Sequence, residues 1–220
     1  MKVFVYGARG HGKVVADILL AEAHHDIRGF LDDDQNLSGL SVLGFQVIGG
    51  EARLRSETTK GRIGVALGVG DNSSRKKLAE LCKLLGVPIV TAIHPSAIIS
   101  KAASVKDGTV VMAGAVINPC AEIGFGVIVN SGAVIEHDVW IGDYAHVSPN
   151  ASMGGESRLG TLSHLGLGAI ILPGVAVGSR TVIGAGAVVT HQMPDNVVAM
   201  GVPARIHRTV LEGALSKGAQ

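Results

Sequence analysis

The sequence has few aromatic residues and few charged residues for its length. Only seven of its 220 residues are Phe, Tyr or Trp, although the hydrophobic content reaches 47%. The core is therefore expected to consist of small aliphatic side chains without large aromatic anchors. The hydrophobic content excludes an intrinsically disordered chain. No apolar run approaches the roughly 18 residues that a membrane-spanning helix needs.

Net charge and cysteine are equally scarce. The chain has 19 Lys and Arg against 18 Asp and Glu, a net charge of +1, so no electrostatic attraction to nucleic acid or to an anionic membrane is expected. Its two cysteines, Cys82 and Cys120, lie far apart, which is typical of a reduced protein rather than a disulfide scaffold. The first residues lack the long apolar region of a signal peptide, and we expect a cytoplasmic protein.

Glycine, by contrast, is abundant, with 31 residues or about 14% of the chain, roughly twice ordinary usage. It does not recur at every third position, as it does in collagen. The charged residues divide the chain in two, because residues 1–95 carry 22 of them and residues 98–190 carry only 10. This shift in composition predicts two domains of different architecture.

The first part alternates short apolar strands with helices, which predicts a small Rossmann-like α/β domain with a parallel sheet. Strands are expected at residues 2–6, 27–31, 63–67 and 88–93, and helices at 13–23 and 73–85. A glycine-rich turn, Gly7–Gly12, follows the first strand, and its N–H groups can face a phosphate. Its glycine spacing is not the G-x-G-x-x-G fingerprint, which argues against a dehydrogenase.

The second part has a strict period of six residues. From Ile99 to Val189, all sixteen positions at this spacing are Ile, Val, Leu or Met, and the residue two positions before each is small or β-branched. This is the hexapeptide repeat signature. Three repeats form a triangular coil of eighteen residues, and the coils stack as parallel strands about 4.8 Å apart. The pattern predicts about five coils, with Phe125, Trp140 and Tyr144 pointing outward.

Hexapeptide runs of this kind resemble the left-handed parallel β-helix acyltransferases, which are typically trimers. Gly-Val-Pro-Ala-Arg at residues 201–205 matches the Gly-x-Pro-Ala-Lys/Arg ending common in them. Residues 6–12, 29–33 and 135–138 narrow the resemblance further. They are similar to the bacterial nucleotide-sugar N-acetyltransferases, which include the bacillosamine-pathway and perosamine enzymes. The sialic acid O-acetyltransferases are close relatives.

The resemblance implies transfer of acetyl from acetyl-CoA to the amino group of a nucleotide-linked 4-amino-4,6-dideoxy sugar, in a homotrimer. It implies a nucleotide-sugar-binding α/β domain over residues 1–95, a left-handed β-helix acetyltransferase domain over 96–205, and a C-terminal tail over 206–220. Two alternatives stay open: a sugar O-acetyltransferase of the sialic acid type, and a non-catalytic nucleotide-sugar-binding protein. The family uses uridine, thymidine and guanosine carriers, and the residues do not choose among them.

His137 is the candidate general base, because only the neutral amine attacks a thioester and imidazole titrates near neutral pH. It matches the family's catalytic histidine, with Asp138 where the family often has Glu, and Asp138 or Glu136 could orient the ring. Gly155 lies eighteen residues on and should stack beside His137, where its N–H could stabilise the oxyanion. Cys120 has no basic neighbour in sequence and is expected to be a packed thiol, so direct transfer is favoured.

Ligand contacts follow from the resemblance residue by residue. It places acetyl-CoA at His146, Gly155, Leu167 and Ala185, and the nucleotide sugar at Arg9, Gly10, His11, Asp32, Asp33, Gly68 and Asn130. His137 and His146 are half a coil apart, so we expect them to share a site only where neighbouring subunits meet. The histidine spacings lack the close pair of the zinc-binding γ-class carbonic anhydrases, and no metal is expected.

Overall fold

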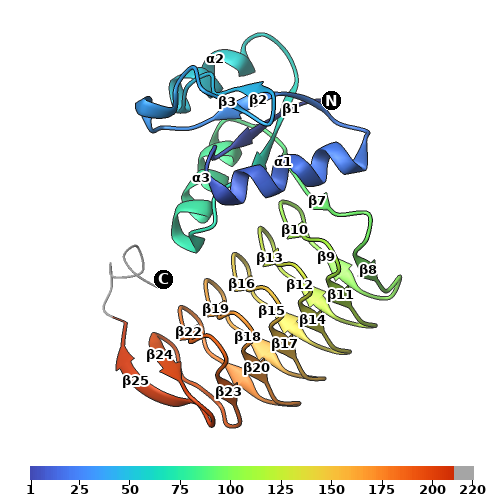
Figure 1. Ribbon diagram of the computed structural model, residues 1–220, viewed down its shortest axis with the longest axis vertical. Helices are drawn as coiled ribbons and strands as arrows, with labels where there is room; N and C mark the ends of the chain where they lie inside the picture. The colour runs from blue at the N-terminus through green and yellow to red at the C-terminus, as the bar shows by residue number, and fades with distance from the viewer. Residues whose placement is uncertain (211–220) are drawn as a thin grey trace. The chain divides into compact units, whose positions relative to one another are not determined.

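The structure, a computed structural model, describes residues 1–210, and the last ten residues of the expected tail lie outside the described part (Figure 1). It divides into two compact units, Met1–Pro95 and Ser96–Gln220, which we call the N-terminal unit and the β-helix unit. Within residues 1–210, no helix is both long and apolar enough to cross a membrane.

The N-terminal unit is built on a four-stranded parallel sheet in the order β2-β1-β5-β6. Its strands are β1 (Lys2–Tyr6), β2 (Asp26–Leu31), β5 (Ile63–Leu67) and β6 (Ile89–Val90), followed by β7 (Ala92–Ile93), and its helices are α1 (Gly10–Glu22), α2 (Glu51–Thr58) and α3 (Asn72–Leu84) (Figure 1). A short hairpin, β3 (Ser41–Val42) and β4 (Phe45–Gln46), and a 3-10 helix, η1 (Gln35–Leu37), complete it. The hairpin and α2 were not predicted, and α1 begins three residues earlier than expected.

The central strand β1 is apolar along its length because both faces of the sheet are covered. Val3 and Val5 are fully buried, and α1 buries Val15, Ile18 and Leu19 on one face. Burying each such side chain contributes about 1.5–3 kcal/mol. The carboxyl ends of β1, β2 and β5 lie at one edge of the sheet, because all three strands are parallel and adjacent. The loops that follow them form the first candidate site.

The β-helix unit is a left-handed parallel β-helix of two-residue strands that form three sheets. One sheet contains β10 (Val110–Val111), β13 (Ile128–Val129), β16 (His146–Val147), β19 (His164–Leu165) and β22 (Val182–Ile183). The second contains β8 (Ile98–Ile99), β11 (Val116–Ile117), β14 (Val134–Ile135), β17 (Ser152–Met153), β20 (Ile170–Ile171) and β23 (Val188–Val189). The third contains β9 (Ser104–Val105), β12 (Glu122–Ile123), β15 (Trp140–Ile141), β18 (Arg158–Leu159) and β21 (Ala176–Val177).

The hexapeptide period accounts for this packing. Strands eighteen residues apart pair in register, as Ile117 does with Ile135, and the repeat positions from Val111 to Val189 are all buried. The helix has about six turns rather than the expected five, because sixteen strands at three per turn fill five turns and begin a sixth. Phe125 and Tyr144 lie off the inward positions and pack edge to face, with ring centroids 5.6 Å apart.

Each coil turns its corners through residues in the left-handed conformation. One column of corners is formed by Cys120 (φ 62°), Asp138 (φ 59°), Glu156 (φ 61°) and Gly174 (φ 71°). His137 and Gly155 each precede a member of this column, which places them on neighbouring coils at the same corner. Cys120, expected to be a packed thiol, is exposed because it occupies a corner.

The chain closes the β-helix with a longer hairpin. Strand β24 (Val197–Met200) extends the first sheet parallel to β22, and β25 (Arg205–Thr209) pairs antiparallel with β24. Residues 206–209 were expected to belong to the tail, but they form most of β25. Backbone hydrogen bonds to β24 hold these residues in a strand.

Candidate functional site

The loops after β1 and β5 approach each other so closely that their glycines have no room for a side chain. A Cβ on Gly7 would lie 2.4 Å from the carbonyl oxygen of Gly68, and one on Gly12 would lie 1.8 Å from the carbonyl oxygen of Gly7. Gly7 also has a φ of +111°, which other residues rarely adopt. The first backbone hydrogen bond of α1 runs from Lys13 N–H to the Arg9 carbonyl, so within residues 1–210 the N–H groups of residues 9–12 have no partner and can face a ligand.

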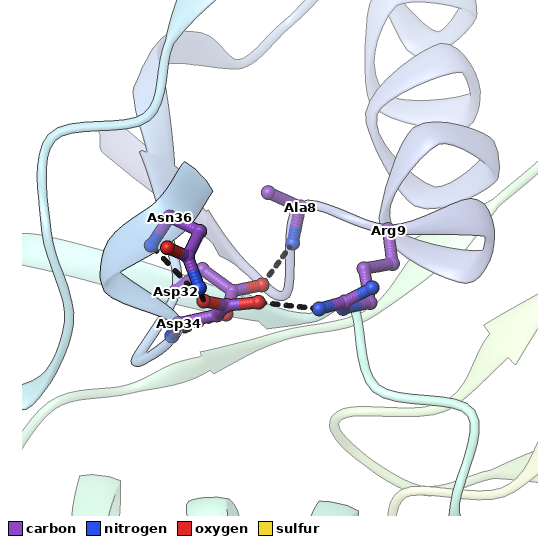
Figure 2. Close-up of polar contacts among 5 residues, drawn as sticks. All are labelled: Ala8, Arg9, Asp32, Asp34 and Asn36. Atoms are coloured by element: carbon purple, nitrogen blue, oxygen red, sulfur yellow. Dashed lines mark hydrogen bonds and ion pairs between the residues drawn. The ribbon is translucent and has the colours of Figure 1, made fainter. Parts of the chain in front are cut away.

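Asp32 holds this turn in place. Its Oδ2 accepts a hydrogen bond from Ala8 N–H at 2.8 Å, and its Oδ1 accepts one from Asp34 N–H at 2.9 Å (Figure 2). Both carboxylate oxygens are thus engaged with backbone. We expected Asp32 to contact the base or ribose, and the structure shows its side chain bonded to the backbone of the turn after β1 and of Asp34.

Asp33 is also occupied within the unit. Its Oδ1 accepts from the Tyr6 hydroxyl at 2.8 Å and from Glu51 N–H at 2.9 Å, which ties the end of β1 to the start of α2. Burial, with Asp33 beside it, raises the pKa of Tyr6. A Cβ on Gly50 would lie 2.1 Å from the same carboxylate oxygen, so glycine is required there.

Asp34 and Asn36 are the polar side chains at this edge that sequence reasoning missed. Asp34 Oδ1 accepts from the backbone N–H and side-chain amide of Asn36 at 3.0 and 2.9 Å, and its Oδ2 pairs with the Arg9 guanidinium (Figure 2). The backbone hydrogen bond from Asn36, foremost, lowers the pKa of Asp34. The Asp-x-Asn spacing, typical of an Asx turn, was the available signal.

His11 and Arg75 provide a buried basic pair beside the turn. Arg75 is fully buried and donates to the carbonyl oxygens of Val69 and Gly70 at 3.1 and 2.9 Å and to Asn72 Oδ1 at 2.7 Å. Burial, with the charge of Arg75, lowers the pKa of His11 to about 4. His11 is therefore neutral at pH 7, and the exposed Arg9 is the residue of the predicted segment that can bring a positive charge to a phosphate.

The second group of residues lies on the β-helix around His137. His137 Nδ1 lies 2.8 Å from Asp138 Oδ2, and both side chains are a little over half exposed. The hydrogen bond to Asp138 is the main cause that raises the pKa of His137, and the charges of Glu136 and Glu156 act in the same direction. With Nδ1–H donated to Asp138, Nε2 carries the lone pair that a base needs.

Gly155 lies directly against the His137 ring, as the eighteen-residue stacking predicted. A Cβ at Gly155 would be 2.6 Å from both Cε1 and Nε2 of His137. Within residues 1–210 the Gly155 N–H has no hydrogen-bond partner, whereas its carbonyl accepts from Gly174 N–H at 2.9 Å. An unpaired backbone N–H beside a base is the arrangement that can bind a developing oxyanion.

A polar ladder runs up the outer face of the sheet that contains β16 and β19. Asn130 Nδ2 lies 3.2 Å from His146 Nε2, and the rings of His146 and His164 stack with centroids 4.6 Å apart and planes 3° apart. Ser148 Oγ lies 2.7 Å from His164 Nε2. We expected Asn130 to contact the nucleotide sugar and His146 to contact acetyl-CoA, and the structure shows these two side chains in contact with each other. His164 and Ser148 were not predicted as site residues.

The remaining predicted residues lie apart from these clusters. Leu167 is 60% exposed, and Ala185, eighteen residues on, is exposed on the same corner column. His137 follows β14 of one sheet, whereas His146 begins β16 of another. Among the described residues, no hydrogen bond or ring contact joins these two histidines.

Comparison with known proteins covers both units. Residues 2–82 match the PglD N-terminal domain, and residues 120–155 match the bacterial transferase hexapeptide family. Over 110 residues the chain is 39% identical to UDP-N-acetylbacillosamine N-acetyltransferase of Bacillus subtilis (strain 168). That match spans 49% of this chain and 49% of that protein, about half the length of the curated relative.

Solved structures that match almost the whole chain include the following two. One is a variant of perosamine N-acetyltransferase from Caulobacter crescentus, with one histidine replaced by asparagine, in complex with CoA and GDP-perosamine. It is 36% identical, with a TM-score of 0.90 over 94% of this chain and 97% of that chain. The other is the acetyltransferase domain of PglB from Neisseria gonorrhoeae FA1090 in complex with acetyl coenzyme A, also 36% identical, with a TM-score of 0.86 over 93% and 98% of the two chains.

Proposed function

Because this chain belongs to the family of N-acetyltransferases that join a PglD-type N-terminal domain to a hexapeptide-repeat β-helix, we propose that it acetylates the amino group of a nucleotide-linked sugar with acetyl-CoA. The sugar is a 4-amino-4,6-dideoxyhexose. The observation that carries the proposal is the corner where His137, hydrogen-bonded to Asp138, lies against the free N–H of Gly155. A base, its carboxylate and an oxyanion donor are the groups that acyl transfer to an amine requires.

The reaction proceeds by direct transfer. The neutral amine attacks, so its nitrogen bonds to the thioester carbonyl carbon and His137 Nε2 accepts the proton that the nitrogen loses. The oxygen becomes an oxyanion, which accepts a hydrogen bond from Gly155 N–H. The carbon–sulfur bond then breaks, CoA leaves as the thiolate, and the proton held on His137 neutralises it. Asp138 orients the ring and stabilises the imidazolium.

The N-terminal unit holds the nucleotide in this proposal. The N–H groups at the start of α1 and the exposed Arg9 face the diphosphate, while Asp34 and Asn36 supply polar atoms for the nucleoside. Asp32 contributes through the turn that it holds, and Asp33 through the start of α2. The relative whose complex contains GDP-perosamine supports a nucleotide-linked sugar as the ligand.

We place the active site between subunits of a homotrimer. His137 lies at the corner after β14, whereas His146 lies on β16 of another sheet, so a site that uses both needs a neighbouring chain. The exposed Leu167 and Ala185 supply apolar surface for the acetyl-CoA chain. The chain has only two cysteines, which suits a reducing compartment, and we propose the cytoplasm. Light scattering together with an activity assay tests the assembly, because a fully active monomer would contradict a shared site.

The test is turnover with UDP-, dTDP- and GDP-linked 4-amino sugars and acetyl-CoA, followed by thiol release. The wild-type protein should acetylate one carrier best, and mass spectrometry of the product should locate the acetyl group on nitrogen. H137N should reduce kcat roughly 10²–10⁴-fold while both ligands still bind. H207N, at an exposed histidine outside the site, is the matched control. Wild-type turnover by H137N would eliminate His137 as the base.

A further inference from the structure

The end of α1 and the loop that follows it gather three metal-binding side chains. Glu22 is the last residue of α1, and His24 and His25 lie in the loop before β2. One ligand atom from each of the three lies within 4.8 Å of the other two. Ala23 adopts the left-handed conformation, with φ of 55°, and so ends the helix and reverses the chain at this point.

The Glu22–His25 pair is spaced as two ligands of one ion. Glu22 Oε2 and His25 Nε2 lie 3.2 Å apart, and their side chains are only 11% and 12% exposed. Both atoms are buried, and within residues 1–210 this ion pair is the one polar contact that either atom makes. Two donors of a tetrahedral zinc site with bonds of about 2.0–2.1 Å lie about 3.3 Å apart, close to the observed distance.

The surroundings orient these ligands as metal ligands are usually oriented. His24 Nδ1 lies 3.0 Å from the Glu22 carbonyl oxygen, and donation there leaves the lone pair on Nε2. Glu22 Oε1 accepts from Ile93 N–H at 2.9 Å, which leaves Oε2 for an ion. Metal-bound imidazoles and carboxylates are fixed by such outer hydrogen bonds.

The ligand set also favours one class of metal ion. Two imidazoles and one carboxylate suit zinc, whereas calcium and magnesium prefer oxygen ligands.

We propose that Glu22, His24 and His25 bind a zinc ion, with water in the fourth position. The ion would tie the end of α1 to the β2 loop and, through the Glu22–Ile93 hydrogen bond, to β7. The three ligands include no residue assigned to nucleotide-sugar binding or acetyl transfer. The ion therefore stabilises the N-terminal unit without taking part in turnover, and the inference does not depend on the proposed function.

The experiment is zinc titration of the full-length protein, free of any histidine tag and stripped with EDTA, by calorimetry and thermal unfolding. The wild type should bind zinc saturably and unfold at a higher temperature with it, because a ligand of the folded state stabilises that state. H24A removes an exposed side chain, and E22Q keeps an oxygen for Ile93 N–H. Each should weaken zinc binding at the affected site about tenfold or more. H207A is the matched control and should bind as the wild type does.

Several results would overturn the proposal. The first is that the wild-type protein shows no saturable zinc binding. The second is that H24A and E22Q bind zinc as tightly as H207A does. The third is that magnesium raises the unfolding temperature as much as zinc does. Acetyl transfer is assayed separately in the same stripped samples. Unchanged turnover fits a structural ion, whereas turnover that zinc restores would contradict that role. Because the titration needs no sugar or CoA, failure of the acetyl-transfer proposal leaves its result intact.

Discussion

Gly155 leaves the space that the His137 ring occupies on the neighbouring coil. A Cβ at position 155 would lie 2.6 Å from Cε1 and Nε2 of His137, closer than real Cβ atoms approach other atoms. The ring is more than half exposed, so an added methyl group would push it outward. The absence of one side chain thus sets the position of another, eighteen residues away.

G155A is therefore expected to reduce kcat by displacing the base, while the β-helix stays folded. We expect a loss of about tenfold or more, because a misplacement of about 1 Å can reduce a rate 10²-fold. Steady-state kinetics and thermal unfolding measure the two effects. The matched control is H137N: in that background G155A should have little further effect. Additive losses in the double variant would show that Gly155 acts independently of His137.

The pH dependence of the reaction should report the His137–Asp138 pair. The raised pKa of His137 keeps the ring protonated to higher pH than a free histidine, so kcat/KM should rise as pH rises through that value. D138N removes the largest cause of the shift and should move this rise to lower pH, with a lower plateau. Asparagine also tolerates the left-handed conformation at this corner.

The control for the pH profile is E156Q, which removes the smallest contribution to the raised pKa of His137. Its profile should move in the same direction but by less than that of D138N. Profiles are measured from about pH 5 to 9 at fixed ionic strength, because exposed charges are screened by salt. Identical profiles for D138N and the wild type would show that the hydrogen bond does not control the base.

Two glycines in the first turn of α1 should respond oppositely to the same substitution. G12A places a Cβ 1.8 Å from the carbonyl oxygen of Gly7, whereas within residues 1–210 nothing lies within 4 Å of a Cβ at Gly10. G12A should destabilise the N-terminal unit by about 1–3 kcal/mol or more through overpacking. G10A should leave its stability unchanged or slightly raised, since alanine favours a helix. Hydrogen exchange of β1 peptides in urea compares the two, and equal protection would contradict the close contact.

The fold of the β-helix followed from the sequence because one local rule repeats. Every sixth residue from Val111 to Val189 is buried, so a single phase fixes strands, corners and stacking together. The eighteen-residue interval between stacked positions likewise predicts that Gly155 lies against His137. The helix α2 escaped prediction because it buries only Leu54 and therefore shows no amphipathic period.

The hydrogen-bond partners of individual polar side chains could not be predicted from a sequence period. Asp32 and Asp33 were expected to face a ligand, yet their partners are Ala8 and Tyr6, 24 and 27 residues away in sequence. Nothing local in Asp32-Asp33-Asp34 tells which carboxylate the backbone will engage. The sequence gives no signal for the cluster that contains His24 and His25. Its third member, Glu22, is held by a hydrogen bond from Ile93 N–H, which lies 71 residues later in the sequence.

The polar ladder predicts that His164 acts on acetyl-CoA binding through His146. Its ring stacks on His146, and Ser148 Oγ lies 2.7 Å from its Nε2. H164A removes the stacked face but leaves the contact between Asn130 and His146, so His146 stays in place with less support. We expect KM for acetyl-CoA to rise about 2–10-fold, the value of one ring contact, with a smaller change in kcat.

The control for H164A is S148A, which keeps the stacked ring and removes the hydroxyl beside it. It should raise KM for acetyl-CoA less than H164A does, and neither variant should change KM for the nucleotide sugar. Steady-state kinetics with each substrate varied in turn separates the two constants. A fall in kcat alone, with both KM values unchanged, would place His164 in the chemical step. Equal rises in both KM values would instead indicate a general loss of structure, because only one substrate is expected to depend on His146.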